Sequence, residues 1–158
     1  MRLWIDRLSV FCLLLAASRP LAAQGRPIQV EGAKNLAFGI LLAGTPLSVA
    51  RTDPVGAGQI NVAAQPNAQI ILQLSPPSVM NGPAGATLPI SFSANDAGYS
   101  PIGVITSQTA FDPRSSAVVL TNTRNGRGTV YVGGTAQPSA SQRPGNYTGV
   151  ITLTVAYP

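Results

Sequence analysis

The sequence predicts an all-β protein, an immunoglobulin-like antiparallel β-sandwich or a related one, with about seven to nine strands. Two observations predict this class. No window repeats apolar residues at the three-and-four spacing of a helix, whereas many windows alternate apolar and polar residues. In addition, 16 glycines and 14 prolines interrupt the chain every few residues, as is typical of short strands joined by turns.

The first half of the chain contains five segments with the period-two alternation of a half-buried strand. Turn-forming residues separate them, as in the proline- and glycine-rich segment 53–58. Pro76 and Pro77 end the last of the five, because proline cannot donate to a strand ladder. The apolar positions of these segments are Ile28 and Val30; Leu36, Phe38 and Ile40; Leu47 and Val49; Ile60, Val62 and Ala64; and Ile70, Leu72 and Leu74.

The second half begins with an inward apolar stripe over residues 88–92. The pattern then weakens, and one strand is expected at residues 102–106. Residues 117–121 and 129–132 are expected to form a hairpin, because the connection between them ends in Asn125-Gly126, a strong signal for a tight hairpin turn. No repeat or linker indicates a second domain.

Residues 147–157 form the longest strand pattern of the chain. They are rich in threonine, valine and isoleucine, which suit a pleated, half-buried surface. We expect such a final strand either to lie deep in a sheet or to pair with another chain. The side chains expected on its inward face, which are the candidate assembly residues, are Tyr147, Gly149, Ile151, Leu153, Val155 and Tyr157.

Residues 1–23 have the pattern of a secretory signal peptide. Arg2 and Arg7 form a basic start, residues 8–17 are apolar, and cleavage is expected after Ala23, with Ala22 as the alternative. The apolar run is shorter than the roughly 20 residues that a membrane-spanning helix needs. We therefore expect one mature domain, residues 24–158, which has no stable membrane span and is exported to the periplasm or the cell surface.

The residue types that most enzyme sites require are scarce in this chain. Histidine is absent and the single cysteine, Cys12, lies in the expected leader, so the mature chain cannot form a Ser-His-Asp triad, a Cys-His pair or a usual zinc site. A carboxylate pair is the remaining enzymatic option. However, Asp53 and Asp112 precede proline, and Asp96 lies in an Asn-Asp-Ala-Gly turn sequence. We therefore expect a non-enzyme, with no catalytic residue, metal or cofactor.

The basic residues allow two interpretations. The mature chain keeps seven basic and four acidic residues, scattered along the sequence without the clustering that nucleic-acid binding requires. Four arginines lie in or beside expected loops: Arg114, Arg124, Arg127 and Arg143. We favour solvated loop charges. In the alternative, they gather at one end of a self-contained monomeric sandwich and bind a glycan or an anionic surface polymer.

Several short motifs occur in one order along nearly the whole mature chain. They include a Gly-x-Tyr-x-Gly motif at residues 145–149, which leads into a strand that ends in Val-Ala-Tyr. The other motifs are residues 36–39, 53–54, 69–76, 88–92 and 131–135. Together they resemble the bacterial family called domain of unknown function 4402, which is related to the spore coat protein U and fimbrial-subunit families.

This resemblance implies a pilin-like sandwich that is exported and assembled or displayed at the cell surface. It implies no catalytic residues. In the fimbrial relatives the C-terminal strand meets a periplasmic chaperone and later the donor strand of a neighbouring subunit. By resemblance, that role would fall on Ile151, Leu153, Val155 and Tyr157. Unlike many such pilins, however, the mature chain has no disulfide, and residues 24–35 are short for a donor strand.

Overall fold

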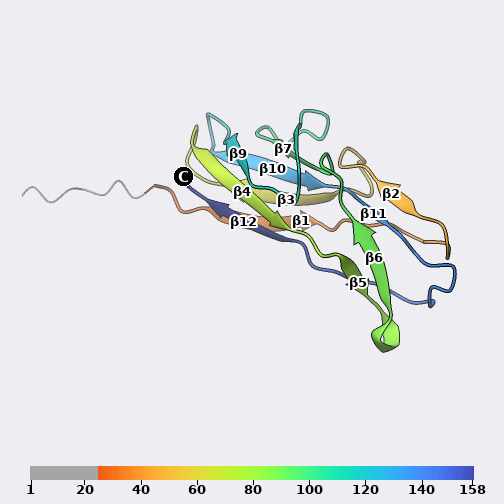
Figure 1. The fold of residues 1–158 in the computed structure, drawn as a ribbon. Helices are drawn as coiled ribbons and strands as arrows, with labels where there is room; N and C mark the ends of the chain where they lie inside the picture. The colour runs from red at the N-terminus through yellow and green to blue at the C-terminus, as the bar shows by residue number, and fades with distance from the viewer. Residues whose placement is uncertain (1–24) are drawn as a thin grey trace, which may run out of the picture.

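The computed structural model describes residues 25–158 and confirms the all-β class. Twelve strands form three antiparallel sheets (Figure 1), and the one other regular element in this part of the chain is a single 3-10 turn, Pro83–Gly85. The expected signal peptide and its cleavage site lie outside the described residues. Strands outnumber the expected seven to nine because glycine and proline divide long extended segments into shorter ones.

A five-stranded sheet forms one layer of the sandwich. Its spatial order is β1-β3-β10-β7-β8, so β1 and β8 are its edges. Each neighbouring pair is antiparallel. The strands are β1 (Gln29–Lys34), β3 (Gly58–Ala63), β7 (Ala97–Ser100), β8 (Thr109–Phe111) and β10 (Arg127–Val132).

A three-stranded sheet of order β12-β4-β9 forms the second layer, with β4 in its centre. Its strands are β4 (Gln69–Ser75), β9 (Ala117–Leu120) and β12 (Thr152–Ala156). The third sheet has the order β2-β11-β6-β5 and extends both layers, because only Gly133 separates β11 from β10 and a Pro-Pro segment separates β5 from β4. Its strands are β2 (Leu47–Val49), β5 (Val79–Asn81), β6 (Thr87–Ser91) and β11 (Gly134–Ala136).

The hydrophobic core lies between the layers, as the alternation predicts. Ile70 and Leu72 of β4 are fully buried, and Leu74 is nearly so. Opposite them, Val62 of β3 and Val130 of β10 are buried in the same cluster. Truncating one of these large side chains to alanine removes about 2–5 kcal/mol of stability, through lost burial and the cavity that remains.

Two expected strands are absent from the described structure. Residues 36–40 pair in no ladder, although Leu36 and Phe38 still pack against the core. The alternation in this segment therefore reflects side chains that face the core and not a strand. Residues 102–106 form a turn-rich loop in which Gly103 has a φ of +70°. Val104 N–H donates to Ser100 Oγ at 3.1 Å and stabilises this loop, and strands β7 and β8 lie on either side of it.

The expected hairpin between β9 and β10 is wrong, although its turn is correct. Gly126 N–H donates to Asn122 O at 3.0 Å, and Gly126 has a φ of +71°. The two strands nevertheless lie in different layers: β9 pairs with β4, whereas β10 pairs with β3 and β7. The turn therefore carries the chain from one sheet to the other. The Asn-Gly sequence predicted the position of the turn, but it did not predict which strands pair, because that depends on how the two layers pack around the core.

Candidate functional site

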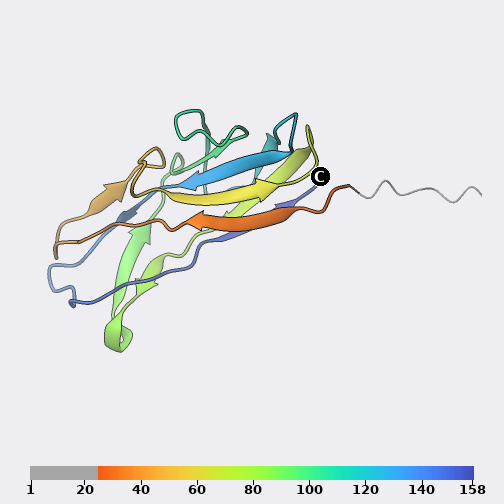
Figure 2. The same ribbon diagram turned by 180° about the vertical axis from the view of Figure 1, so that it is seen from behind.

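Two neighbouring strand edges have no partner in the described structure. Strand β1 pairs only with β3, and β12 pairs only with β4. Figures 1 and 2 show both strands along the same side of the molecule, one from each layer. The outer backbone N–H and C=O groups of such edges are free to pair with another chain.

An apolar groove with a volume of about 590 Å³ opens between these edges. Val30, Gly32 and Lys34 of β1 line one wall, and residues 147–149 and 151–153 line the other. The period-two alternation of β1 explains this, since every second residue turns toward the groove. The apolar side chains at the base of the groove are Ile60, Met80, Ile90 and Val132.

Gly32 leaves open space inside the groove. A Cβ atom added to Gly32 would meet no heavy atom within 4 Å. Gly149, on the opposite wall, is different, because a Cβ there would lie 3.2 Å from Pro77 Cγ and 3.3 Å from Met80 Cγ. The wall formed by β1 can therefore accept a side chain, whereas the opposite wall is already close-packed.

The inward face predicted for the final strand agrees with the structure over its C-terminal half. Ile151, Leu153 and Val155 are half-buried and pack against the core, and the residues between them are exposed. Leu153 lies opposite Leu74, and Val155 lies opposite Leu72. The strand is shorter than expected, because the ladder with β4 begins only at residue 152.

The N-terminal half of the predicted assembly strand is held differently. Thr148 forms an isolated bridge with Asn81, with N···O distances of 2.7 and 2.9 Å. The Tyr147 hydroxyl donates to Arg143 O at 2.6 Å and accepts from Gln142 Nε2 at 2.7 Å. This half is therefore joined to β5 by the two backbone hydrogen bonds of one bridge, and the Tyr147 hydroxyl attaches it to the preceding residues 142–143.

Tyr157 joins the ends of the two groove walls. Its hydroxyl donates to Arg26 O at 2.6 Å and accepts from the Gln65 N–H at 2.9 Å. Gly25 lies beneath its ring, since a Cβ there would be 3.8 Å from Tyr157 Cε2. The segment before β1, the β3–β4 connection and the end of β12 are thus held together at one point.

The four predicted arginines do not line one common site. Arg114 lies before β9 and forms a salt bridge to Asp112, with an N···O distance of 3.1 Å. Arg124 lies in the turn before β10, and Arg143 lies in the β11–β12 connection beside Tyr147. Arg127 alone among the four lines a polar hollow on the outer face of the five-stranded sheet.

The aspartates each accept hydrogen bonds from nearby backbone. Asp53 Oδ1 accepts the N–H groups of Val55 at 2.8 Å and Gly56 at 3.1 Å, and these bonds lower the pKa of the Asp53 carboxyl. Asp96 Oδ2 accepts the Ser93 N–H at 2.7 Å. Hydrogen bonds from the Arg114 side chain and N–H lower the pKa of Asp112. All three side chains therefore stabilise turns, as their sequence contexts predict.

Residues 25–158 contain neither a cluster of metal ligands nor a membrane-spanning helix. No three His, Cys, Asp or Glu side chains in this part of the chain lie close enough to hold a metal ion together. Within the same residues, no helix has the length and apolar character needed to cross a membrane.

Comparison with known families shows which family the chain belongs to. A family model described as domain of unknown function (DUF4402) matches residues 28–157. The chain belongs to this family. The DUF4402 match includes all twelve strands, both free edges and the groove between them, and it confirms the family resemblance read from the sequence motifs. A search of curated proteins found no match to the chain.

Proposed function

We propose that this DUF4402 protein is an exported structural protein, a pilin-like or coat-like subunit displayed at the bacterial cell surface. Subunits would join by strand addition in the groove between β1 and β12. The observation that carries this proposal is the apolar groove between two free strand edges that belong to opposite layers. The relation to spore coat protein U and fimbrial subunits that the family resemblance implies supports the same role.

Strand addition fits the chemistry of the groove. An extended segment placed there can exchange main-chain hydrogen bonds with the free edge of either wall, which supplies affinity without sequence specificity. Its alternate side chains would point toward Ile60, Met80 and Val132, and the opposite ones toward solvent. The open space at Gly32 provides room for one such side chain. Specificity would come from the fit of these inward side chains.

We assign the added strand to a second copy of the chain, through its segment 25–35. This segment is short for a pilin donor strand, but its eleven residues exceed the five ladder residues of β12. This segment has apolar residues at period two, Ile28 and Val30, yet Val30 is 44% exposed. All of β1 except Lys34 is exposed, and the strand has a single ladder partner. It is therefore an exposed edge strand that local opening can release from its own sheet. A periplasmic chaperone that contributes the strand is the alternative partner.

The test uses the solution mass and thermal melt of residues 24–158, expressed without a chaperone. Gly32→Phe would fill the groove from its open wall, so we expect a folded monomer that no longer associates. Gln29→Phe is the matched control, because it places the same ring on the opposite face of β1, and it should associate like the parent chain. A peptide copying residues 25–35 should compete with association.

The proposal fails if Gly32→Phe and Gln29→Phe associate equally, or if the parent chain stays a monomer at every concentration and ignores the peptide. Strand addition from a chaperone predicts a third result. The parent would then be poorly folded when expressed alone, and the peptide would not rescue it.

A further inference from the structure

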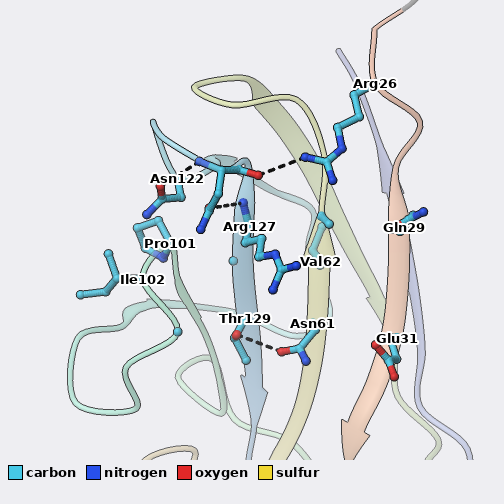
Figure 3. A pocket seen from close by; sticks show the side chains of 14 residues that line it. Arg26, Gln29, Glu31, Asn61, Val62, Pro101, Ile102, Asn122, Arg127 and Thr129 are labelled. Atoms are coloured by element: carbon cyan, nitrogen blue, oxygen red, sulfur yellow. Dashed lines mark hydrogen bonds between the residues drawn. The ribbon is translucent and has the colours of Figure 1, made fainter.

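A second concave site lies on the outer face of the five-stranded sheet, on the side of β1 that turns away from the groove. This hollow has a volume of about 390 Å³. Its floor is formed by β1, β3 and β10 (Figure 3). Three segments that are distant in sequence surround the floor: the residues before β1, the loop 101–103 after β7, and the turn 122–127.

Two arginines that line the hollow give it positive charge. Arg26 Nη1 donates to Asn125 O at 3.2 Å, which positions this guanidinium at the rim. Arg127 lies across the face of the sheet toward β3 (Figure 3), and its guanidinium has no hydrogen bond or ion pair with another described residue. Glu31 is the acidic residue among those that line the hollow. Counting these three side chains, the hollow has a net charge of about +1.

The remaining polar groups are neutral and can both donate and accept hydrogen bonds. Thr129 Oγ1 donates to Asn61 Oδ1 at 3.1 Å, which leaves the Asn61 amide NH₂ group free for a ligand. Pro101 and Ile102 add an apolar wall, and Ile102 is 59% exposed. The neutral polar side chains around the hollow are Gln29, Asn61, Asn122, Asn125 and Thr129.

The walls of the hollow are held in place by their own hydrogen bonds. Asn122 Oδ1 accepts the Arg124 N–H at 2.9 Å, and Asn125 Oδ1 accepts the Arg127 N–H at 3.0 Å. On the other side, Tyr131 Oη donates to Gly103 O at 2.8 Å and ties the loop to the sheet. A preformed site needs little ordering when a ligand binds.

We propose that this hollow binds an acidic saccharide, namely a sugar unit with one carboxylate and several hydroxyls. The carboxylate would lie between the Arg26 and Arg127 guanidiniums, which are suited to planar anions. The sugar hydroxyls would exchange hydrogen bonds with Asn61 and the other amides and donate to Glu31. The apolar wall at Ile102 would pack against ring C–H groups.

The charges distinguish this ligand from the other candidates. A neutral sugar would leave both guanidiniums unpaired and partly desolvated, which costs free energy. A phosphate monoester would place more negative charge near the Glu31 carboxylate, which repels it. One carboxylate with neighbouring hydroxyls matches a hollow that contains two cations, one anion and several neutral amides.

The test is a titration of residues 24–158 with a short oligogalacturonate, followed by backbone amide NMR and calorimetry. We expect amide shift changes at Arg26 and at residues 28–31, 61–63, 102–103 and 122–129, and we expect the affinity to fall as salt is added. Each of Arg26→Gln and Arg127→Gln should lower affinity about tenfold or more, since each removes a charge-assisted hydrogen bond. Arg124→Gln is the matched control: it lies in the same turn outside the hollow and should bind within about twofold of the parent.

Three results would overturn this inference. A neutral oligogalactose could bind as tightly as the oligogalacturonate, or Arg124→Gln could lower the affinity as much as Arg127→Gln. The amide shift changes could also be confined to residues outside the hollow. Glu31→Gln gives a further check, because it should increase the affinity for a phosphorylated oligogalactose more than the affinity for the oligogalacturonate. An unchanged ratio of the two affinities would contradict the charge argument. Arg26, Gln29 and Glu31 belong to the segment assigned to strand addition, so the hollow is complete only while β1 stays in its own sheet. Gly32→Phe should remain a monomer with β1 in place, and it should therefore keep its saccharide affinity even where it abolishes association.

Discussion

The Tyr157 hydroxyl bonds provide the sharpest stability prediction. Tyr157→Phe removes the bonds to Arg26 O and Gln65 N–H and keeps the ring. A neutral hydrogen bond contributes about 1 kcal/mol net, and the freed groups here are exposed enough to reach water, so the two bonds together should contribute about 1–2 kcal/mol. For a domain of this size, that loss corresponds to a melting temperature lower by about 3–8 °C.

The matched control is Tyr99→Phe. The Tyr99 hydroxyl is buried and has no hydrogen-bond partner among the described residues, so its removal should leave stability unchanged or raise it by about 1 kcal/mol. Calorimetry of the two variants beside the parent provides the comparison. If Tyr157→Phe melts with the parent while Tyr99→Phe melts lower, the energetic assignment of both hydroxyls is wrong.

The Tyr157 variant also has a local consequence. Because the hydroxyl attaches the segment before β1 to the end of β12, its loss should increase amide hydrogen exchange in residues 26–34 more than in β4. Under the proposed function, the freed segment should associate more readily with a second copy. Deleting residues 157 and 158 removes the ring as well, and we expect a lower periplasmic yield. Normal yield and assembly after this deletion would count against strand addition.

Three further predictions concern buried groups and a turn. Tyr131→Phe should cost about 1 kcal/mol in calorimetry, because its hydroxyl donates to Gly103 O. Burial raises the pKa of Tyr99 to about 12 and also raises the pKa of Tyr131, so the folded state holds these protons longer than the unfolded state. The free energy of unfolding is therefore unaffected by these two groups below about pH 10 and falls as the pH rises toward 12. For Tyr99 the loss is up to about 3 kcal/mol, and denaturant unfolding across that pH range measures it. Gly126→Ala should cost about 2–4 kcal/mol in the same assay, because φ is +71° and the new Cβ would collide with Ala64 O.

The sequence predicted those parts of the fold that depend on local pattern. The alternation of Ile70, Leu72 and Leu74 located the central strand β4, and the two prolines after it located its end. The same rule failed at residues 36–40, because a segment can direct alternate side chains into a core without joining a ladder. It also missed the short strands β5, β7, β8 and β11, of three or four residues each. The equally short β2 was located because Leu47 and Val49 follow a clear turn sequence.

Of the two candidate sites, one could be predicted from a local sequence pattern and the other could not. The inward face of β12 was predictable, because one strand contains all its positions. The hollow was not, since Arg26 and the turn that it contacts are 99 residues apart and only the sheet order brings them together. One local signal for both sites was present: Gln29 and Glu31 alternate with Val30 and Gly32, so β1 has a polar and an apolar face.

Free strand edges are an aggregation hazard, so a chain that uses them must restrict how they pair. Two features of β1 and β12 do so. The register of β1 shifts between Gly32 and Lys34, and Lys34 Nζ donates to Pro54 O at 2.7 Å, which places a charged side chain at one end of the groove wall. Tyr157 connects the two walls at the other end. Between these limits β12 forms only five ladder residues, about 17 Å of edge. A short edge that is blocked at both ends can pair with one strand in only a few registers. The partner is therefore selected by how its inward side chains fit the groove, and not by backbone pairing alone.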